Sequence, residues 1–556
     1  MKHRFTMFVV IVVVTSSLVG GFLGGNAAAG SNDAQTSPNE FLSNFTEALD
    51  VIQRTYVDNV GPDKLVYSAI KGMLRALDPH SSFFDPKEFA RLREEQHSKY
   101  FGLGIRVRAL LRDRGRVVIV EPPAIGSPAE RRGLRAGDVI TKIEGESIDD
   151  WTSDEVVNHL RGPRGTTVHI TVERPGVHDP LQFKVVRDEI LIITVPYAFD
   201  IKPGIGYIKI DRFSESTADE LRDKLKKLDA SNLNGLILDL RDNPGGLLNQ
   251  AIEVADFFVP RGELIVSTKG RMEGSARPYR APSLEKVRVP LVVLINRHSA
   301  SASEIVSGAL QDHDRALIVG ETSFGKGLVQ SVYTLENDTG MALTTAKYYT
   351  PSGRLIQRDY SGSTFEYYYM NSGTPTAEEK DKEIKFTDAG RKVYGGGGIA
   401  PDVIVPMREL NRFEALLTSK DIFFEYARRL TSGQVPAASN FQLPLKNEEV
   451  STPAAKASKS LPKFEITDAI LGDFKEFLRS RKLDFSDEDI QNNVDFIKRR
   501  IKQEVYTSSF GLQEGFKVAI QGDTQVQKAL EVLPEAKSLM ATGHIAPIVP
   551  GSEAKK

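Results

Sequence analysis

The sequence predicts a multi-domain protein of the α/β class, on three observations. The chain has 556 residues, more than a single hydrophobic core usually holds, so three or four domains are expected. Residues 234–258 have the pattern of a buried strand, a glycine-rich turn and a helix. Residues 289–312 repeat that order, because the apolar run VPLVVLIN precedes apolar residues at helical spacing. Strands that alternate with helices are typical of α/β folds.

Composition excludes several kinds of function. Lysine and arginine number 72 against 74 aspartate and glutamate, so the charge balance gives no reason to expect nucleic acid as a partner. The chain contains no cysteine, which rules out disulfides, a thiol nucleophile and cysteine-based metal sites.

Residues 1–30 have the features of an export signal. Lys2 and Arg4 precede a charge-free stretch over residues 5–32, and the small residues at 27–29 suit a cleavage site. The apolar part is marginal for a membrane span, which needs about 20 residues. We therefore expect an exported protein, either periplasmic or anchored to the outer face of the cytoplasmic membrane. A cleaved signal peptide and an uncleaved N-terminal membrane anchor both stay open.

Residues 37–98 are expected to form a helical region. Ser37, Pro38 and Glu40 have the spacing of a helix start with a capping box. The apolar residues that follow fall on one helix face, namely Phe41, Phe45, Leu49 and Ile52. We expect that face to pack on the rest of the protein, with subunit pairing as the alternative.

Residues 99–188 resemble a PDZ domain. The resemblance rests on YFGLGIRV at 100–107 and on GSPAERRGLRAGDVITKIEGESI at 126–148. A PDZ domain is β-rich with two helices and binds a chain end as an added strand on its sheet edge. The resemblance implies that the amides of Leu103 and Gly104 hold the free carboxylate of a peptide. The alternative is that the glycines only permit a tight turn.

Three serines lie where a predicted strand meets a predicted helix: Ser299, Ser301 and Ser303. Backbone N–H groups are unpaired at a helix start, and the helix dipole favours negative charge there. Such a position suits a nucleophile whose reaction creates an oxyanion. The alternative for Ser299 or Ser301 is a simple helix cap.

The pattern SASASEI…QD…GETSFGKGLVQ resembles the active-site region of the carboxyl-terminal processing peptidases, which use a Ser/Lys dyad. The resemblance implies that Ser301 is the nucleophile, that Lys326 is the general base and that Gln330 orients the lysine. No cofactor and no metal is implied. Asp312, at the end of the serine helix, is either a supporting residue or a surface carboxylate.

A lysine base must have its pKa lowered by its surroundings. A free lysine titrates near ~10.4, and lowering that pKa to about 7 costs roughly 4 to 5 kcal/mol. Burial among apolar neighbours such as Phe324, Leu328 and Val329 is the expected cause.

An oxyanion hole needs two donors, and the DLRDNPGG segment is similar to the family element that supplies one. The resemblance implies a glycine amide beside the amide of Ala302, and whether Gly245 or Gly246 provides it stays open. We expect Asp239 and Arg241 to pair under the turn and to be structural.

Two rival motifs are weaker. GETSFGKG at 320–327 matches the start of a phosphate-binding loop, but Gly327 stands where that loop needs Ser or Thr, and a strand rather than a helix is expected next. His298 and His313 lie near the serines, but the chain has no G-x-S-x-G elbow and no H-E-x-x-H zinc motif. His313 is expected to be a solvated residue at a helix end.

The family resemblance extends over residues 189–407, which we interpret as a Ser/Lys peptidase core of α/β type. Within it, residues 359–383 are polar and rich in tyrosine and are expected to be a surface insertion. A helical continuation follows over 408–444, then a linker over 445–463, whose composition is linker-like. Residues 464–556 are expected to form a helical extension, and core docking, dimerisation and adaptor binding all stay open for it.

Together these features predict an exported serine endopeptidase that cleaves protein substrates near their carboxyl termini, with the PDZ domain recognising the substrate terminus and gating activity. The expected partners are proteins or peptides with free carboxyl termini. An adaptor protein, a homo-oligomer and membrane association through the N-terminal segment stay open. The alternative function is a non-catalytic PDZ scaffold or adaptor on a peptidase-like fold.

Overall fold

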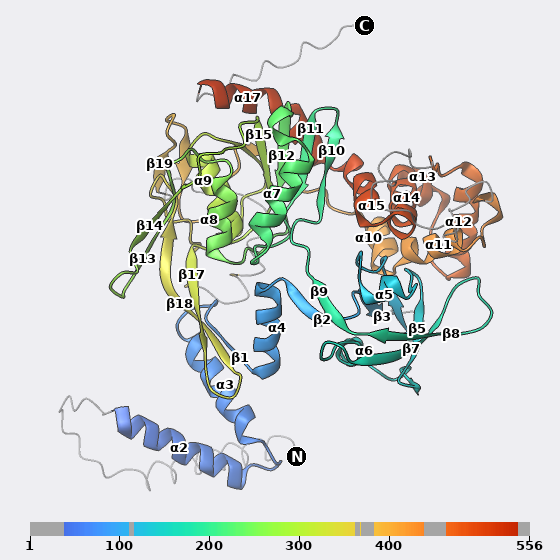
Figure 1. Cartoon of the computed structure of the whole chain (residues 1–556), viewed down its shortest axis with the longest axis horizontal. Coiled ribbons are helices and arrows are strands. Elements are labelled where there is room, and N and C mark those ends of the chain that lie inside the picture. Colours follow the sequence, from blue (N-terminus) through green and yellow to red (C-terminus); the bar gives the residue numbers. More distant parts are fainter. Residues whose placement is uncertain (1–37, 110–115, 362–366, 368–382, 439–462, 543–556) are drawn as a thin grey trace, which may run out of the picture. The chain divides into compact units, whose positions relative to one another are not determined.

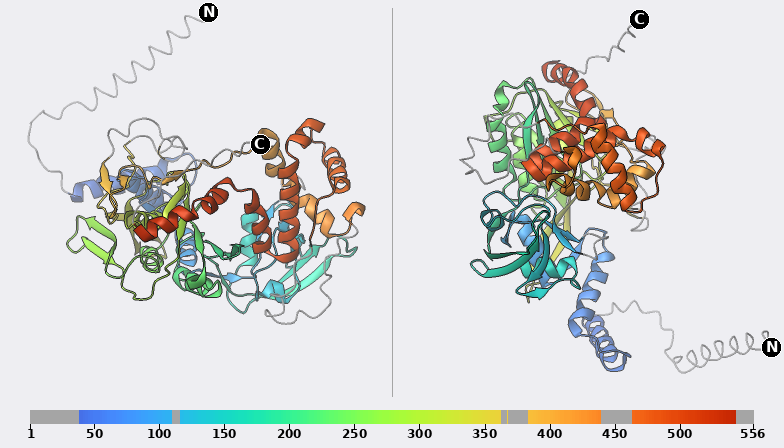
Figure 2. Two further views of the ribbon diagram at one scale, coloured as in Figure 1. Left: turned by 90° about the horizontal axis from the view of Figure 1, so that it is seen from above. Right: turned by 90° about the vertical axis from the view of Figure 1, so that its right-hand side faces the viewer.

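The computed structural model describes residues 38–109, 116–361, 367, 383–438 and 463–542 (Figures 1 and 2). The chain divides into two compact units, one up to Gly72 and one from Met73 onward. The predicted export segment over 1–30, the linker over 445–463 except its last residue, and most of the insertion over 359–383 lie outside the described residues. Among the helices described, none is both long and apolar enough to span a membrane.

The first unit contains helix α2 (Pro38–Thr55) and most of α3 (Pro62–Arg75). The predicted helix is therefore present. Its apolar stripe is exposed, however, with Phe41 at 63% and Phe45 at 44% of full exposure.

The centre of the second unit is a six-stranded sheet in the order β10-β11-β12-β15-β16-β21. Strands β11 to β21 run parallel, and β10 pairs antiparallel with β11. The predicted strand–turn–helix segments form β12 with α8 and β15 with α9. The bounds are β10 (Tyr197–Lys202), β11 (Ile205–Lys209), β12 (Gly235–Asp239), β15 (Leu291–Ile295), β16 (Leu317–Gly320) and β21 (Val403–Ile404).

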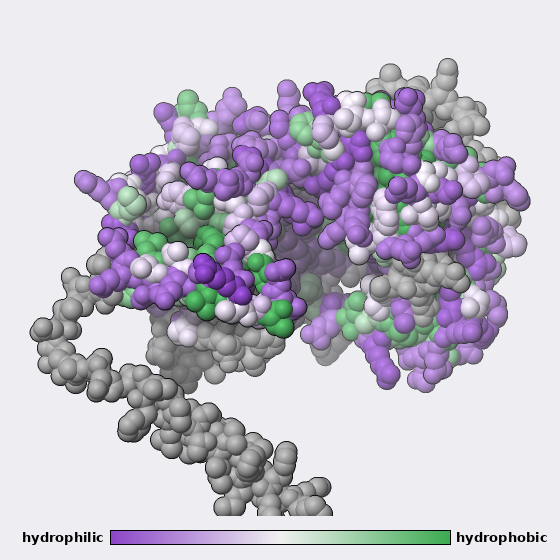
Figure 3. Space-filling view, turned by 90° about the horizontal axis from the view of Figure 1, so that it is seen from below, coloured by the Kyte–Doolittle hydropathy of each residue, from purple (hydrophilic) through white to green (hydrophobic). Residues whose placement is uncertain are grey.

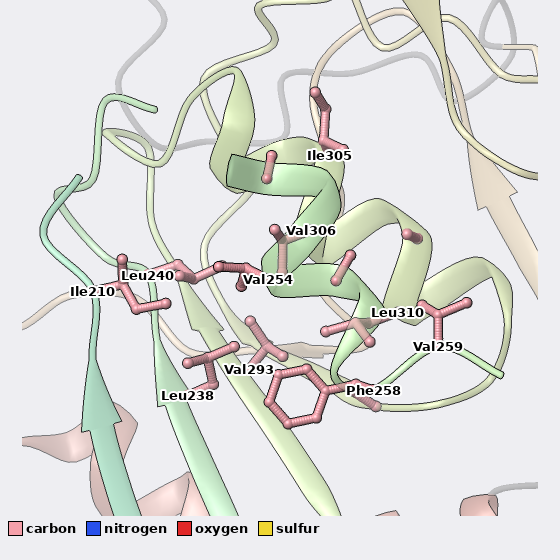
Figure 4. Packing of buried hydrophobic residues seen from close by; sticks show 14 of the residues in the cluster. Ile210, Leu238, Leu240, Val254, Phe258, Val259, Val293, Ile305, Val306 and Leu310 are labelled. Atoms are coloured by element: carbon pink, nitrogen blue, oxygen red, sulfur yellow. The ribbon is translucent and has the colours of Figure 1, made fainter. Parts of the chain in front are cut away.

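Helices cover both faces of this sheet. On one face, Leu238 and Val293 pack with α7 (Thr217–Lys227), α8 (Leu248–Asp256) and α9 (Ala302–Asp312), and Figure 4 shows Val254 and Val306 on the same side of these strands. The alternate strand residues Ile237 and Val292 pack instead with α16 (Thr524–Glu531) and α17 (Leu533–Thr542). Part of the C-terminal extension therefore docks on the core and completes a three-layer α/β arrangement.

A second sheet has the order β1-β18-β13-β14, with β17 also paired to β18. All of its pairings are antiparallel. Its first strand comes from the region predicted as helical, which therefore contains a strand as well as helix α4 (Pro86–Gln96). The bounds are β1 (Ser82–Phe84), β13 (Leu264–Gly270), β14 (Arg277–Arg280), β17 (Leu328–Thr334) and β18 (Gly340–Tyr349); a separate hairpin contains β19 (Ile384–Phe386) and β20 (Lys392–Tyr394).

Residues 99–188 form the β-rich, two-helix fold expected of a PDZ domain. Its six-stranded sheet has the order β3-β4-β5-β7-β8, with β6 on β5, and the entering strand β2 pairs with the leaving strand β9. The bounds are β2 (Lys99–Gly102), β3 (Val107–Ala109), β4 (Val117–Ile119), α5 (Pro128–Arg131), β5 (Val139–Ile143), β6 (Glu146–Ser147), α6 (Ser153–Leu160), β7 (Thr167–Glu173), β8 (Leu181–Val186) and β9 (Asp188–Leu191).

The remaining C-terminal helices share a core of their own, and one of them also contacts the PDZ domain. Phe424 packs with Val118 and Val139, and Arg108 pairs with Asp421 at 2.8 Å. The bounds are α10 (Arg412–Ser419), α11 (Ile422–Thr431), α12 (Asp468–Ser480), α13 (Asp487–Asn492), α14 (Val494–Phe510) and α15 (Leu512–Ala519), with short 3-10 turns at Ala230–Asn232, Pro436–Ala438 and Ile520–Gly522. On the face drawn in Figure 3, hydrophilic residues predominate and hydrophobic ones form only small patches.

Candidate active site

Ser301 lies between β15 and α9 in a strained backbone conformation. Its φ of 52° and ψ of −110° place a non-glycine residue in the left-handed half of the Ramachandran plot. Neighbouring groups hold this conformation. The Ser301 N–H donates to Glu304 Oε2 at 2.7 Å, and the Tyr348 hydroxyl donates to the Ser301 carbonyl at 3.1 Å. Strain of this kind persists only where the surroundings enforce it.

The two flanking serines, Ser299 and Ser303, are buried and form structural hydrogen bonds. The Ser299 hydroxyl donates to the Leu240 carbonyl at 2.8 Å and accepts from the Asn296 N–H at 2.9 Å. The Ser303 hydroxyl donates to the Asn243 carbonyl at 3.0 Å. Both side chains are 0% exposed, whereas Ser301 is only half-buried. Of the three predicted candidates, Ser301 is therefore the one that a substrate can reach.

Glu304 connects the serine helix to the lysine loop, and the sequence analysis did not identify it. Its fully buried carboxylate accepts hydrogen bonds from Ser301 N–H, Ser323 Oγ, Gly325 N–H and Lys326 N–H at 2.5 to 2.9 Å. Burial raises the pKa of the Glu304 carboxyl, and these hydrogen bonds oppose that rise. A glutamate three residues after a helix-capping serine is a capping-box signal, so the sequence contained a clue to its local role.

Lys326 lies in the loop between β16 and β17. Burial lowers the pKa of its amine, and the carboxylates of Glu304 and Asp78 act in the opposite direction. The lysine main chain is held at both sides, because the Tyr348 hydroxyl donates to its carbonyl and the Gly327 N–H donates to Gln357 Oε1 at 2.8 Å. A lowered pKa is what a general base at neutral pH requires.

Gln330 follows on β17, where its side-chain amide donates to Thr344 Oγ1 at 3.2 Å. Thr344 belongs to the neighbouring strand β18. The hydrogen bond seen for Gln330 therefore runs across the sheet, and its predicted role in orienting Lys326 stays a prediction.

The two candidate glycines of the oxyanion turn have different neighbours. A Cβ placed on Gly245 would lie 2.9 Å from both the Ala302 nitrogen and Ser301 Cβ, whereas one on Gly246 would lie 1.9 Å from the Phe213 carbonyl oxygen. Gly245 is therefore the glycine that packs against the serine and the Ala302 amide. Its own N–H donates to Asn243 Oδ1 at 2.9 Å, so it can serve an oxyanion only if that bond is shared or released.

The predicted pairing under this turn is confirmed. Arg241 binds Asp239 at 2.6 Å, and both residues are buried. Burial alone would raise the pKa of the Asp239 carboxyl, but Arg241 and Lys209 hold it well below its usual range. This pair therefore stays ionised and supports the turn.

Asp312 lies at the opposite end of α9 from Ser301, roughly 16 Å away along the helix. Its carboxylate binds Arg354 at 2.6 Å and accepts from the Ser352 N–H at 3.0 Å, and its side chain is 1% exposed. The expectation of a surface carboxylate is wrong. Asp312 ties α9 to the segment after β18 and does not reach Ser301.

His313 is also buried, at 5% side-chain exposure, so its prediction as a solvated residue is wrong. Its ring nitrogens contact Asp388 Oδ2 at 2.7 Å and the Leu264 carbonyl at 2.6 Å. Both partners lie away from Ser301. Within the described residues, no group of three or more histidine, aspartate or glutamate side chains is placed to hold a metal ion.

The predicted carboxylate loop of the PDZ domain has the required backbone form at Gly104. Its φ is +79°, and a Cβ there would lie 2.4 Å from Ser127 Cβ, so only glycine fits. The carbonyls of Leu103 and Gly104 accept from Ala129 and Ala124 at 3.0 and 2.8 Å, which fixes the loop on α5 and the segment before it.

Comparison with known proteins gives consistent similarities. The model of peptidase family S41 matches residues 204–364, a PDZ domain model matches 119–174, and a model described as the activating protease CtpB N-terminal domain matches 22–88. A carboxy-terminal-processing protease of Bartonella bacilliformis is 43% identical over 321 residues, which cover 57% of this chain and 72% of the relative. The carboxy-terminal processing protease CtpA of Bacillus subtilis is 35% identical over 362 residues, 64% of this chain and 76% of the relative. Among solved structures, a photosystem II D1 C-terminal processing protease is 29% identical with a TM-score of 0.34, covering 67% of this chain and 94% of that one.

Proposed function

The chain belongs to peptidase family S41, the carboxy-terminal processing serine proteases, and we propose that it is an exported endopeptidase that cleaves protein substrates near their carboxyl termini with Ser301 as nucleophile and Lys326 as general base. Ala302 and Gly245 supply the amides of the oxyanion hole in this proposal, and Gln330 orients the lysine.

One observation carries the proposal: a single buried carboxylate binds the backbones of both Ser301 and Lys326. Glu304 accepts from the Ser301 N–H at 2.7 Å and from the Lys326 N–H at 2.9 Å. The serine helix and the lysine loop are thereby held in one rigid unit. Such preorganisation is what a nucleophile and its base require, since small displacements of reacting groups reduce rates strongly.

The reaction follows from the protonation states. The neutral Lys326 amine takes the proton of the Ser301 hydroxyl as Oγ bonds to the substrate carbonyl carbon, and the negative charge moves to the carbonyl oxygen near the Ala302 amide. The lysine ammonium then donates that proton to the leaving amine as the peptide bond breaks. In the second half, Lys326 takes a proton from a water as the water oxygen bonds to the acyl carbon, and returns that proton to Ser301 Oγ as the Oγ–acyl bond breaks.

The PDZ domain is proposed to hold the substrate's free carboxylate at the amides of Leu103 and Gly104 and to gate the site. Support comes from the enclosed glycine loop and from the way the domain is attached. Its first and last connections, β2 and β9, pair with each other, so one strand pair links the domain to the core. Rigid-body rotation of a domain about its connection is a known form of switching, and this strand pair is where the PDZ domain would rotate.

The competing function is a non-catalytic PDZ scaffold. The strained conformation of Ser301 and the buried lysine amine disfavour it, because neither feature is needed for peptide binding by a PDZ domain. Export is supported by the sequence of residues 1–30 alone, with a periplasmic or membrane-anchored location.

The deciding experiment is mass spectrometry of candidate exported proteins incubated with wild type, Ser301→Ala and a matched control. Ser331→Ala is the control, because Ser331 follows Gln330 on β17 and its hydroxyl hydrogen-bonds to Thr345 Oγ1 at 2.7 Å. We expect new carboxyl termini with wild type and Ser331→Ala and none with folded Ser301→Ala. Cleavage by folded Ser301→Ala would exclude the proposed nucleophile.

A further inference from the structure

The turn Asp78–Ser81 reaches the lysine side of the site from the N-terminal part of the chain. It leads directly into β1, whose Ser82 lies opposite Ala342 of β18. The same β18 pairs with β17, the strand that follows Lys326. The sheet therefore brings this turn beside a loop that lies far away in the sequence.

The turn is closed by the carboxylate of Asp78. Asp78 Oδ1 accepts from the N–H groups of His80 and Ser81 at 2.8 and 2.7 Å, and Oδ2 accepts from Ser81 Oγ at 2.7 Å. These hydrogen bonds lower the pKa of the Asp78 carboxyl against the rise that burial causes. Asp78 is therefore a partly buried negative charge near Lys326.

Ser81 connects the turn to Gln330. The Thr344 N–H donates to Ser81 Oγ at 3.1 Å, and Gln330 Nε2 donates to Thr344 Oγ1 at 3.2 Å. A continuous path of hydrogen-bonding residues thus runs from Asp78 through Ser81 and Thr344 to Gln330.

His80 packs against Phe324, two residues before the lysine. The two rings meet edge to face with centroids 6.4 Å apart, and His80 Nε2 contacts the Tyr367 hydroxyl at 2.7 Å. Burial, and then the charge of Lys326, lower the pKa of His80 to about 4. The ring is therefore neutral at neutral pH and adds no second cation beside the lysine.

We propose that the Asp78–Ser81 turn is part of the catalytic apparatus, in which Asp78 sets the charge balance at Lys326 and Ser81 holds Gln330 in place through Thr344. Both are positioning residues, since they act through Lys326 and Gln330. This inference rests on the proposed role of Lys326 as general base.

The charged and titratable groups around Lys326 determine the direction of the test. Glu304 faces it from α9, and Asp78 and His80 face it from the turn. The Tyr348 hydroxyl of β18 donates to the Lys326 carbonyl, the Arg358 guanidinium lies over the Phe324 ring, and Tyr367 contacts His80. The Asp78 carboxylate stabilises the lysine ammonium. Removal of its charge therefore lowers the pKa of Lys326 further.

The first test is the pH profile of kcat/KM for Asp78→Asn. We expect its acid limb to move to lower pH than in wild type. Asp85→Asn is the matched control, because Asp85 lies in the same segment and its carboxylate also accepts a backbone N–H, that of Glu88 in α4. The control should keep the wild-type limb and nearly the wild-type stability, because asparagine caps a helix about as well as aspartate does. An unchanged limb, or one at higher pH, in Asp78→Asn would overturn the charge role.

The second test is a double-mutant cycle of Ser81→Ala and Thr344→Val. Each single change should lower kcat by roughly ten- to a hundredfold, as displacement of a catalytic group does. The double variant should be no slower than the slower single one, because both changes break the same path. Ser81→Thr, which keeps the hydroxyl, should restore activity. Additive losses or unchanged kcat would overturn the positioning role.

Failure of this inference is distinguishable from failure of the proposed function. If Ser301→Ala and Lys326→Ala are inactive while the two tests above show no effect, the dyad stands and the turn has no catalytic part. If folded Lys326→Ala retains activity, the general base itself is wrong.

Discussion

The guanidinium of Arg241 donates to the carboxylate of Asp523 at 2.8 Å, across 282 positions of sequence. The same Nη1 atom donates to Gln525 Oε1 at 2.8 Å. Arg241 begins the turn that carries Gly245, and Asp523 caps α16 by accepting from the N–H groups of Gln525 and Val526. The C-terminal helices therefore support the base of the proposed oxyanion turn as well as one face of the central sheet.

Asp523→Asn should weaken this support while keeping the helix cap, because asparagine caps helices as well as aspartate does. We expect a loss of about 1 to 3 kcal/mol in the free energy of unfolding, typical of a lost hydrogen bond to a charged group, together with a lower kcat. Denaturant unfolding and steady-state kinetics measure both. Lys528→Ala on the same helix is the control, since the Lys528 amine pairs with the exposed Glu531 at 3.1 Å. Equal behaviour of the two variants would remove the proposed link.

Ser301 and Ser299 should respond differently to alanine. Ser301→Ala should abolish turnover with little change in stability. Ser299→Ala should instead destabilise the fold by about 1 to 3 kcal/mol, because the buried Leu240 carbonyl loses its hydroxyl partner. Thermal unfolding and peptide hydrolysis, measured on both variants, check this. A fully active Ser301→Ala protein would contradict it.

The pH dependence follows from the lowered pKa of Lys326. Above that pKa the amine is neutral and can accept the serine proton, so activity should rise with pH through one limb. The folded pKa lies below the ordinary lysine value of 10.5, so the unfolded chain binds more protons between the two values. The stability contributed by this group therefore rises with pH across that window.

Lys326→Met removes the titrating amine and therefore tests whether the pKa of Lys326 is lowered in the folded protein. Its stability advantage over wild type, measured by denaturant unfolding, should shrink as pH rises toward 10.5. A constant difference at all pH values would show that the folded lysine titrates normally.

The two glycines of the turn should respond differently to alanine. Gly245→Ala places a methyl group 2.7 Å from the Ala300 carbonyl oxygen and 2.9 Å from the Ala302 nitrogen, so the segment that carries Ser301 must shift and kcat should fall severely, with a smaller loss of stability. Gly246→Ala places one 1.9 Å from the Phe213 carbonyl oxygen, where the backbone must move, so loss of stability should dominate. Thermal unfolding beside kcat distinguishes the outcomes. A folded, fully active Gly245→Ala protein would exclude that glycine from the oxyanion hole.

Recognition of the chain end by the PDZ domain is tested with one peptide in two forms. A free carboxylate should give a higher kcat/KM than the amidated peptide, and a change in kcat as well as KM would indicate gating rather than tethering. Gly104→Ala should abolish the difference, because its Cβ would lie 2.4 Å from Ser127 Cβ and distort the loop. Identical kinetics for both peptides would show that the loop plays no part.

Features that depend on a few neighbouring residues could be predicted from the sequence. Ser486 and Asp489 have the spacing of a capping box, and the Ser486 side chain accepts from the Asp489 N–H. The strand–helix junction at Ser301 and the pairing of Asp239 with Arg241 are also local, since the partners are a few residues apart. The tertiary structure still decides where these helices end. The helical segment after Ser486 is divided at Asn493 into α13 and α14.

Features that depend on the path of the chain could only be decided by the tertiary structure. The sequence determined the class of fold, the PDZ pattern and the residue types of the proposed dyad. These features depend on hydrophobic periodicity, turns and motifs, which are set by residues close together in the sequence. It did not place Asp78 near Lys326, Glu304 between serine and lysine, or Asp523 on Arg241. Those contacts form because sheet pairing and helix docking bring together segments that are distant along the chain. The same packing buries the Lys326 amine, which lowers its pKa, and buries the side chains of Asp312 and His313.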